Sequence, residues 1–314
     1  MKCLCCGKEL KNTEKQDNGW HRKCIRSFFG TEEMPEISLD EKFLEKLAEK
    51  TVNKGLTVPG VQKKLSLHLD KTGTEARLTL VDYPTGYILK PASQEYAQLP
   101  EAEHLAMTMA RATGIAVVPF GMLQTGEDRA YITKRVDRLD GHKYAMEDFC
   151  QLSGRSTADK YKGSYEECGK IIKKYSSRRG LDMTEIFLRL IFCDMTGNSD
   201  MHLKNFSLIE TEPGRREFVL SPAYDLLPVN IIMPSDKEFT ALTLNGKKRN
   251  LRRNDFLKLA ENMELSQKAA NKMIDKVLGL KNEYERLIDE AYVSDDFKER
   301  FLALMNDRMR ITAN

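Results

Sequence analysis

The sequence predicts an α+β protein with two lobes, a β-rich first lobe and a helical second lobe, preceded by a small cysteine-rich module. Apolar residues alternate along short segments up to about residue 137 and recur at helical spacing from Met146 onward, which indicates the lobes. Four of the seven cysteines fall within the first 24 residues, which indicates the module. We therefore expect domains at residues 1–30, 31–137 and 138–314, for which 314 residues are enough.

The composition is that of an ordinary globular protein, with 41% hydrophobic and 31% charged residues. A net charge of +3 is too small a bias to indicate a nucleic-acid or membrane partner. No apolar run approaches the roughly 18 residues of a membrane span, and the N-terminus lacks the apolar region of a signal peptide. We therefore expect a cytoplasmic location and no membrane partner.

The cysteine-rich module carries the ligand spacing of a structural zinc site. Cys3-x-x-Cys6 and His21-x-x-Cys24 are separated by 14 residues, so that two short turns each offer two ligands. Four protein ligands leave no open position, which favours a structural Zn²⁺ in a zinc-ribbon-like module. Because Cys5 lies next to Cys6, the sequence leaves open which cysteines would bind the metal. The alternative to a zinc site is a reduced cysteine-rich tail without metal.

The residues after the zinc ligands are expected to complete the module and to lead into the first lobe. Trp20 is expected to cap the small core, and Phe28-Phe29-Gly30 to end the module. Residues 31–38 have the composition of a linker, and residues 40–50 have the pattern of an amphipathic helix.

The first lobe begins with a glycine-containing turn at residues 54–64, which leads into a half-buried strand at 65–69. Residues 77–81 and 86–89 are the expected partner strands. Backbone amides of a glycine turn beside lysines can bind phosphate. A simple hairpin turn remains the alternative for this segment.

Lys90 ends the apolar strand 87–90, and a lysine in this position of a protein kinase contacts nucleotide phosphates. A helix is expected at 99–113, where Glu101 or Glu103 could pair with Lys90; the sequence does not choose between them. A solvent-exposed lysine is the usual alternative.

Two further strands, 117–123 and 129–135, are expected to pair through the turn 125–128 and to lead into a hinge, Lys134-Arg-Val-Asp137. The second lobe is expected to be helical. Its predicted helices are residues 146–152, 164–176, 182–196, 253–263 and 266–291.

The loop after helix 182–196 carries the candidate chemistry and leads into a short strand at 206–209. Asp200 and Asn205 have the same interval as the base and the metal-binding Asn of the protein-kinase catalytic loop. Asp225, in a later short turn, could supply the charged ligand that Mg²⁺ prefers. The alternative is that these are ordinary turn and capping residues.

Five segments together resemble the HipA toxin kinases, bacterial serine/threonine kinases with a protein-kinase-like core. The resemblance extends over about residues 50–290 and implies a bilobal, protein-kinase-like (HipA-like) fold. The segments are Val58-Pro-Gly-Val-Gln-Lys-Lys64, Tyr87-Ile-Leu-Lys90, Met146-Glu-Asp-Phe-Cys-Gln151, Gly197-Asn-Ser-Asp-Met-His-Leu-Lys-Asn-Phe-Ser207 and Pro222-Ala-Tyr-Asp-Leu226.

The resemblance implies a role for each candidate residue. Asp200 would be the catalytic base, Asn205 and Asp225 would hold Mg²⁺, and Lys90 would bind the ATP phosphates. Thr57 stands where the family can autophosphorylate. The remaining implied nucleotide-binding residues are Val58, Pro59, Gly60, Val61, Gln62, Lys63 and Lys64 of the phosphate loop, Lys134 and Val136 of the hinge, and Gln151 and His202.

The resemblance also implies partners. Family members pair with a helix-turn-helix antitoxin (HipB-like), so DNA would be contacted only indirectly, and their protein substrates include aminoacyl-tRNA synthetases. Full-length members carry an additional subdomain before the kinase core, where this chain has the cysteine-rich module. It therefore resembles the short forms, in which a separate small subunit can replace that subdomain.

Three other functions remain open at this point. The chain could be a small-molecule kinase on the same fold, or a non-enzymatic subunit that binds an antitoxin–DNA complex. The basic residues of the cysteine-rich module also permit nucleic-acid binding. The complete set of Lys90, Asp200, Asn205 and Asp225 argues against a non-enzymatic subunit.

Overall fold

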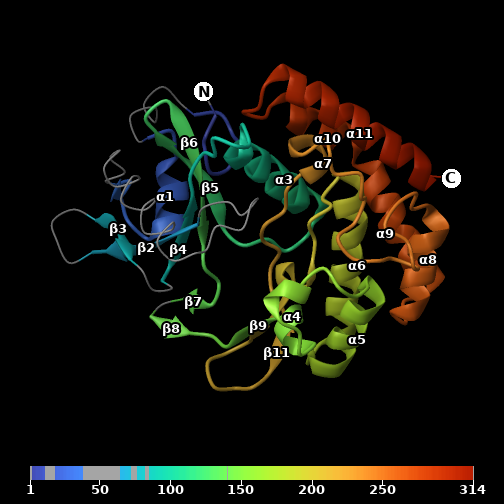
Figure 1. The fold of residues 1–314 in the computed structure, drawn as a ribbon. Coiled ribbons are helices and arrows are strands. Elements are labelled where there is room, and N and C mark those ends of the chain that lie inside the picture. The colour runs from blue at the N-terminus through green and yellow to red at the C-terminus, as the bar shows by residue number, and fades with distance from the viewer. Residues whose placement is uncertain are drawn as a thin grey trace. The chain divides into compact units, whose positions relative to one another are not determined.

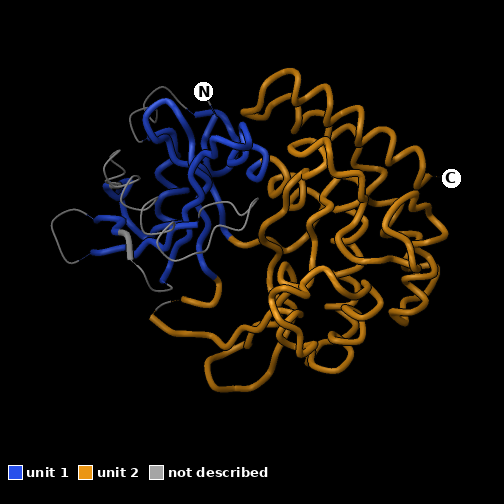
Figure 2. Tube along the Cα trace, viewed as in Figure 1, with its two compact units in different colours: residues 1–104, 119–135 blue, residues 105–118, 136–314 orange. Residues whose placement is uncertain are grey.

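The chain folds into two compact units, which are described separately here (Figures 1 and 2). Unit 1 comprises residues 1–104 and 119–135, and unit 2 comprises residues 105–118 and 136–314. The predicted domain boundaries stay predictions; in this division the cysteine-rich segment is part of unit 1. The computed structural model describes residues 2–10, 18–37, 64–71, 76–81, 85–139 and 141–313.

Unit 1 contains a six-stranded sheet in the order β1-β3-β2-β4-β6-β5. All neighbouring strands are antiparallel except β1 and β3, which run parallel. The predicted strands from β2 to β6 are confirmed, whereas residues 36–37, predicted as part of a linker, form β1. The strands are β1 (Glu36–Ile37), β2 (Leu65–Asp70), β3 (Arg77–Val81), β4 (Tyr87–Lys90), β5 (Phe120–Thr125) and β6 (Asp128–Lys134).

Alternating side chains of β2 explain why this segment is a strand with one buried face. Leu65 and Leu67 are buried and His68 is exposed, which is the period of two that a half-buried strand shows. β5 and β6 join at a tight turn in which Gly126 has a φ of +65°, a conformation that glycine adopts without strain.

The N-terminal segment packs directly on β5. The helix α1 (Arg22–Phe29) ends at Gly30 in the left-handed conformation, as helix C-termini often do. The ring of Trp20 is fully buried, and its indole N–H donates to the carbonyl of Met122, 2.8 Å away. A Cβ on Gly121 would lie 2.5 Å from this ring, so β5 needs a glycine at that point.

Unit 2 is mainly helical and is built around α6, whose apolar residues are almost all buried. Contacts join α6 to α5, α9 and α11. A three-stranded sheet, in the order β11-β10-β9, and the hairpin β7–β8 complete the unit. Its strands are β7 (Arg138–Leu139), β8 (His142–Lys143), β9 (Met146–Asp148), β10 (Ser207–Glu210) and β11 (Phe218–Leu220).

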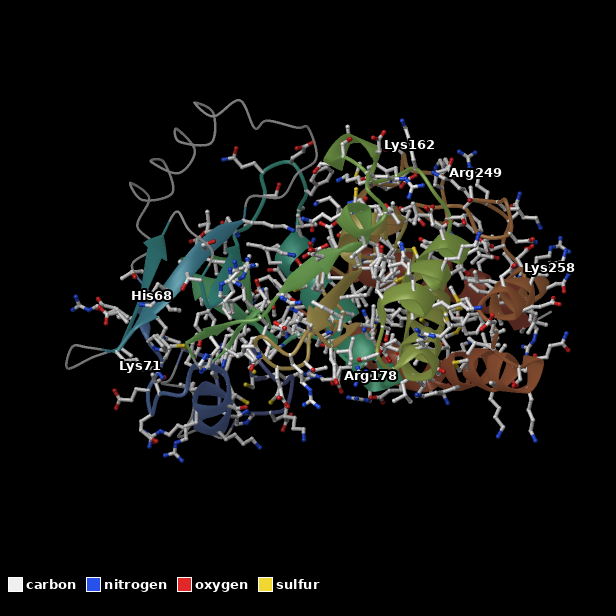
Figure 3. All side chains as sticks on the ribbon, turned by 90° about the horizontal axis from the view of Figure 1, so that it is seen from below. His68, Lys71, Lys162, Arg178, Arg249 and Lys258 are labelled. Atoms are coloured by element: carbon white, nitrogen blue, oxygen red, sulfur yellow. The ribbon has the colours of Figure 1, made fainter. Side chains whose placement is uncertain are left out.

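An ion pair holds the start of α6, the central helix of unit 2. Arg178, labelled in Figure 3, precedes α6 and binds the buried Asp182 at 3.0 Å, so the first turn of α6 is held by an ion pair. The helices are α3 (Leu99–Thr113), α4 (Phe149–Leu152), α5 (Tyr165–Tyr175), α6 (Arg179–Met195), α7 (Val229–Ile232), α8 (Arg253–Asn262), α9 (Gln267–Gly279), α10 (Lys281–Asp289) and α11 (Asp295–Ala313).

The predicted helices are confirmed at α3, α5, α6 and α8, and two predictions need correction. Residues 146–148 form β9 rather than helix. The side chain of Asp148 caps α4 and forms reciprocal hydrogen bonds with Gln151, so the helix begins only after Asp148. Residues 146–148 instead pair with β10. The predicted helix 266–291 breaks at Leu280, which lies between α9 and α10. The helices α1, α7 and α11 were not predicted.

Two expectations fall outside the part of the chain that the structure describes: the helix at 40–50 and the turn at 54–63 with Thr57. Among the described helices, none combines the length and the hydropathy that a membrane span requires.

Candidate active site

The buried lysine of unit 1 is paired with the second of the two candidate glutamates. Lys90 Nζ lies 2.5 Å from Glu103 Oε1, and both side chains are almost fully buried. Glu101 instead lies 3.4 Å from Arg129. Because residues two apart on a helix point about 200° apart, only one of the two can face Lys90. The result is the strand-lysine and helix-glutamate pair that protein kinases require.

In unit 2, the loop after α6 fixes the backbone of Asp200 from both sides. Its N–H donates to Asn198 Oδ1 (3.2 Å), and its carbonyl accepts from Asn205 Nδ2 (2.8 Å). The N–H of His202 donates to the same carbonyl at 2.8 Å. The turn starts at Gly197, whose φ of +67° glycine adopts without strain. The loop is therefore rigid at the residue that is predicted to act as a base.

Asn205 lies in a short 3₁₀ helix, η3 (Leu203–Asn205), and is buried. Since its amide nitrogen donates to the carbonyl of Asp200, its oxygen Oδ1 points away from that bond. A neutral carbonyl oxygen is a ligand that Mg²⁺ accepts. The orientation of this side chain therefore fits the predicted metal role.

Asp225 has a left-handed backbone with a φ of +55°, a conformation that often marks functional residues. The preceding Tyr224 ties this turn to the loop that carries Asp200 and Asn205, because its hydroxyl donates to the carbonyl of Lys204 (3.1 Å) and lies 2.6 Å from Ser207 Oγ. The N–H of Ala223 donates to the carbonyl of Ala116 at 2.7 Å. Asp225 is thus held next to the loop that carries Asn205.

His202 is buried beside both carboxylates, and its Nδ1 has no hydrogen-bond partner among the described residues. Burial lowers the pKa of His202, although the negative charges of Asp200 and Asp225 act in the opposite direction. A buried nitrogen without a partner is costly. This nitrogen, the two carboxylates and the Asn205 oxygen together suit a bound magnesium–phosphate group.

Tyr161 is a residue of this site that the sequence analysis missed. Its hydroxyl donates to Asp200 Oδ1 at 2.6 Å, and its ring meets that of His202 edge to face at 5.0 Å. It belongs to no motif with a recognised spacing, and its contact with Asp200 comes from tertiary structure. Nothing in the sequence pattern indicates it.

Gln151 and the hinge residues occupy other positions. Gln151 Oε1 accepts from the N–H of Asp148, and the Asp148 carboxylate binds Lys204 Nζ at 2.7 Å. Gln151 therefore supports the loop that carries Asn205 through Asp148. Lys134 ends β6 in unit 1, and Val136 begins the next stretch of unit 2. Their predicted nucleotide contacts stay predictions.

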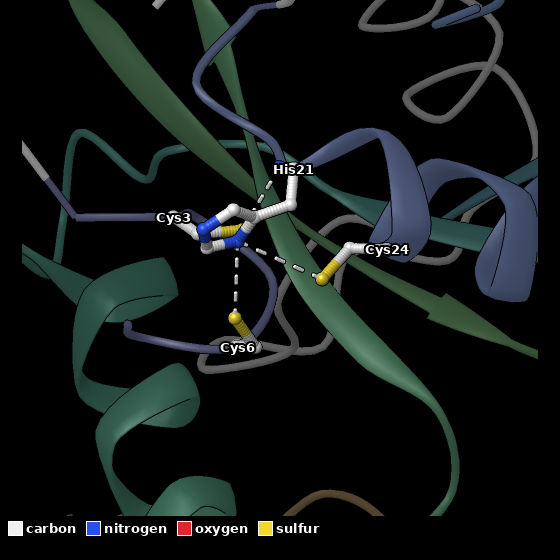
Figure 4. Close-up of side chains that lie close together, drawn as sticks. All are labelled: Cys3, Cys6, His21 and Cys24. Atoms are coloured by element: carbon white, nitrogen blue, oxygen red, sulfur yellow. Dashed lines mark hydrogen bonds between the residues drawn. The ribbon is translucent and has the colours of Figure 1, made fainter. Parts of the chain in front are cut away.

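The four predicted zinc ligands come together in unit 1 (Figure 4). One ligand atom from each of Cys3, Cys6, His21 and Cys24 lies within 4.8 Å of all the others. His21 Nδ1 is 3.4 Å from the sulfur of Cys6 and 4.0 Å from that of Cys24. Tetrahedral zinc with bonds of about 2.3 Å to sulfur and about 2.0 Å to nitrogen separates such ligands by about 3.6 Å. The cluster therefore has the dimensions of a zinc site.

The surroundings of the cluster also favour a metal. His21 Nε2 lies 3.0 Å from the carbonyl of Glu9, a partner of the kind that orients a histidine for metal binding through its other ring nitrogen, here Nδ1. Cys5 is not among the four residues whose ligand atoms gather; its sulfur lies 3.9 Å from the carbonyl of Phe120 and also interacts with the Cys24 thiol. Cys3, Cys6, His21 and Cys24 therefore stay the predicted ligands. The hydrogen bond with Cys24 and burial raise the pKa of Cys3 to about 12. A thiolate there needs a neighbouring positive charge.

Comparison with known proteins places the chain in a family. A family model described as the HipA-like C-terminal domain matches residues 56–283, well over half of the chain. The chain belongs to this family. The predicted relationship to HipA is therefore confirmed.

Several relatives of this HipA-like chain are named as kinases or candidate kinases. It is 36% identical over 229 residues to the candidate kinase Y4dM of Sinorhizobium fredii, a match that covers 68% of this chain and 54% of Y4dM. It is 27% identical over 270 residues to a candidate kinase of Haemophilus influenzae, covering 76% of each chain. The serine/threonine-protein kinase toxin HipA of Shewanella oneidensis is 28% identical over 199 residues, covering 56% of this chain and 44% of the toxin.

Solved structures confirm the protein-kinase-like α+β fold. HipA, in its complex with HipB and operator DNA from Shewanella oneidensis, superposes with a TM-score of 0.67 at 19% identity, covering 82% of this chain and 65% of HipA. The proinflammatory kinase CtkA of Helicobacter pylori superposes with a TM-score of 0.54 at 14% identity, covering 78% of this chain and 93% of CtkA.

Proposed function

We propose that this HipA-like chain is an ATP- and Mg²⁺-dependent serine/threonine protein kinase. The observation that carries the proposal is the loop of unit 2 in which Asp200 is fixed at its backbone while the Asn205 oxygen points away from that bond. The buried pair of Lys90 and Glu103 in unit 1 supports it, as do relatives that are named as kinases.

Each residue has a role that follows from its chemistry. Mg²⁺-ATP supplies the transferable γ-phosphoryl group, and ADP leaves. Asp200 orients the acceptor hydroxyl and takes its proton, Asn205 and Asp225 would hold the metal, and Lys90 would bind the phosphates. Because phosphoryl transfer has a loose transition state, positioning and charge neutralisation supply most of the acceleration. A rigid loop under Asp200 serves that purpose.

We further propose that the kinase acts in a toxin–antitoxin system. The solved HipA structure of similar fold is a complex with HipB and operator DNA, and a relative is named as a kinase toxin. The expected partner is a helix-turn-helix antitoxin through which DNA is contacted, and a separate small subunit is a further candidate. The expected substrate is a cytosolic protein, with aminoacyl-tRNA synthetases as the first candidates.

The proposal is tested by incubating the full chain with Mg²⁺ and γ-³²P-ATP, alone and with a bacterial lysate, beside Asp200→Asn. We expect label in the chain or in a lysate protein with the wild type only. Equal labelling by the variant would contradict the role of Asp200, and no labelling by either would contradict a protein kinase. Intact-mass measurement of the same samples shows whether a phosphoryl group is added to the chain, and peptide mapping shows whether it lies near Thr57.

We also propose that Cys3, Cys6, His21 and Cys24 bind one structural Zn²⁺. The ligand set, the separations in the cluster and the Glu9 partner of His21 support it. All four positions of a tetrahedral ion are filled by protein, so the metal would hold the N-terminal segment in shape.

A further inference from the structure

The carboxylate of Asp200 is oriented by a side chain to which no role has been assigned. The Tyr161 hydroxyl donates to Asp200 Oδ1 at 2.6 Å, and it is the one hydrogen bond to this carboxylate from the residues that the structure describes. The backbone bonds from Asn198 and Asn205 fix the main chain of Asp200. They leave the rotation of its side chain unfixed.

Tyr161 is itself held against the catalytic loop by its neighbours in sequence. The carbonyl of Lys160 accepts from the N–H of Leu203 at 3.2 Å, and the Tyr165 hydroxyl donates to the carbonyl of Met201 at 3.1 Å. Tyr161 lies between these two anchors, with its ring against His202. Its position over Asp200 is therefore built into the fold of unit 2.

The exposure of Tyr161 places it where an acceptor would arrive. Its side chain is 44% exposed, whereas His202 and the loop residues around it are buried. Burial and the neighbouring Asp200 raise the pKa of Tyr161 above its ordinary value. Its hydroxyl therefore stays protonated and acts as a donor. One carboxylate oxygen is occupied by this bond, and the other is left to accept a proton.

We propose that Tyr161 is a positioning residue for phosphoryl transfer: it holds one oxygen of Asp200 so that the other faces the hydroxyl of the protein acceptor. The proposal rests on the proposed kinase function. When the acceptor hydroxyl attacks the γ-phosphorus, its O–H bond breaks, the proton passes to the second Asp200 oxygen, and ADP departs. Tyr161 keeps its own proton throughout.

The test uses Tyr161→Phe, which removes the hydroxyl and keeps the ring. Transfer of ³²P from Mg²⁺-ATP into casein and into the chain itself is measured for this variant, the wild type and Asp200→Asn, with melting temperatures. Tyr175→Phe is the matched control, because Tyr175 is a similarly exposed tyrosine at the end of α5. Tyr165→Phe is the structural comparison, since it removes an anchor of the same segment.

We expect Tyr161→Phe to lower kcat by about 10-fold or more, with the KM for ATP and the melting temperature unchanged, and Tyr175→Phe to match the wild type. An unchanged or increased kcat would overturn the inference, because the hydroxyl would then be idle or would compete with the acceptor. A fall in kcat accompanied by a lower melting temperature, as expected for Tyr165→Phe, would also overturn it. Absent transfer by the wild type, or equal transfer by Asp200→Asn, would instead overturn the proposed kinase function.

Discussion

Asp194, near the end of α6, has a carboxylate buried against Arg308 of α11. Arg308 Nη1 lies 3.1 Å from Asp194 Oδ1, and both side chains are almost fully buried. Burial raises the pKa of Asp194 from 3.8 to about 6, although Arg308 acts in the opposite direction. The folded chain therefore binds this proton more tightly than the unfolded chain does.

This shift predicts a pH dependence of stability. The pKa of Asp194 is higher in the folded chain than in the unfolded chain. The stabilisation that comes from protonating Asp194 is therefore fully present below about pH 4 and is lost as the pH rises through about 6. Between pH 4.5 and 7.5, the free energy of unfolding of the wild type should fall by about 2 kcal/mol relative to Asp194→Asn. Urea unfolding of both proteins at the two pH values measures this difference.

The control for this prediction is Asp295→Asn, since the Asp295 side chain is 94% exposed. Its difference from the wild type should stay the same at both pH values. A difference between the wild type and Asp194→Asn that does not change with pH, or that increases as the pH rises, would contradict the shifted carboxylate.

For single residues, the sequence could predict which side chains belong to the candidate site, but not always which other side chains they contact. The interval from Asp200 to Asn205 is fixed by one short loop, so a local pattern could predict it. Whether Glu101 or Glu103 faces Lys90 depends on how α3 is rotated, and the structure shows Glu103. The bond from Tyr161 to Asp200 joins residues 39 apart in sequence, and no local pattern contains it.

At the scale of elements, the C-terminal helix α11 supports the catalytic loop. Arg308 also donates to Asn230 Oδ1 at 3.3 Å, and Asn230 Nδ2 donates to Ser199 Oγ at 3.3 Å. This chain of contacts leads from α11 to the residue before Asp200. The helix could have been predicted, because buried apolar residues recur every four positions: Phe297, Phe301, Met305 and Met309.

The N-terminal segment plays a comparable part in unit 1. Trp20 lies against the backbone of β5, and Tyr87 of β4 donates its hydroxyl to the carbonyl of Phe28 at 3.2 Å. Since β4 also carries Lys90, the proposed zinc cluster supports the strand of the predicted phosphate-binding residue. The sequence could predict the ligands from their spacing, but not this packing.

Removal of the metal should therefore destabilise unit 1. We expect one zinc per chain by elemental analysis, and Cys24→Ser should lose it and melt at a lower temperature, because the ligands then no longer close the segment. Cys5→Ser is the comparison, since Cys5 is not among the four gathered ligands although it contacts Cys24; it should keep the zinc and melt at a higher temperature than Cys24→Ser. A metal-free wild type, or equal loss of zinc in the two variants, would contradict the assignment.

At the scale of the whole molecule, apolar periodicity was enough to predict a β-rich first part and a helical second part of the chain, but not every element within them. It failed where capping or local geometry decides: the Asp148 cap that turns residues 146–148 into a strand, and the break at Leu280. Both features depend on single hydrogen bonds or backbone angles, and the pattern of hydrophobic residues carries no information about these.

Asp200, Asn205 and Asp225 are proposed to form one phosphoryl-transfer centre that requires Mg²⁺. This proposal is tested most directly by measuring Mg²⁺-dependent ³²P transfer and Mg²⁺-ADP affinity for the wild type, Asp200→Asn and Asp225→Asn. Asparagine also tolerates the left-handed backbone at 225, so this variant should stay folded. We expect both variants to lose transfer, with Mg²⁺-ADP affinity lost only in Asp225→Asn. A folded Asp225→Asn protein with full activity would contradict the account.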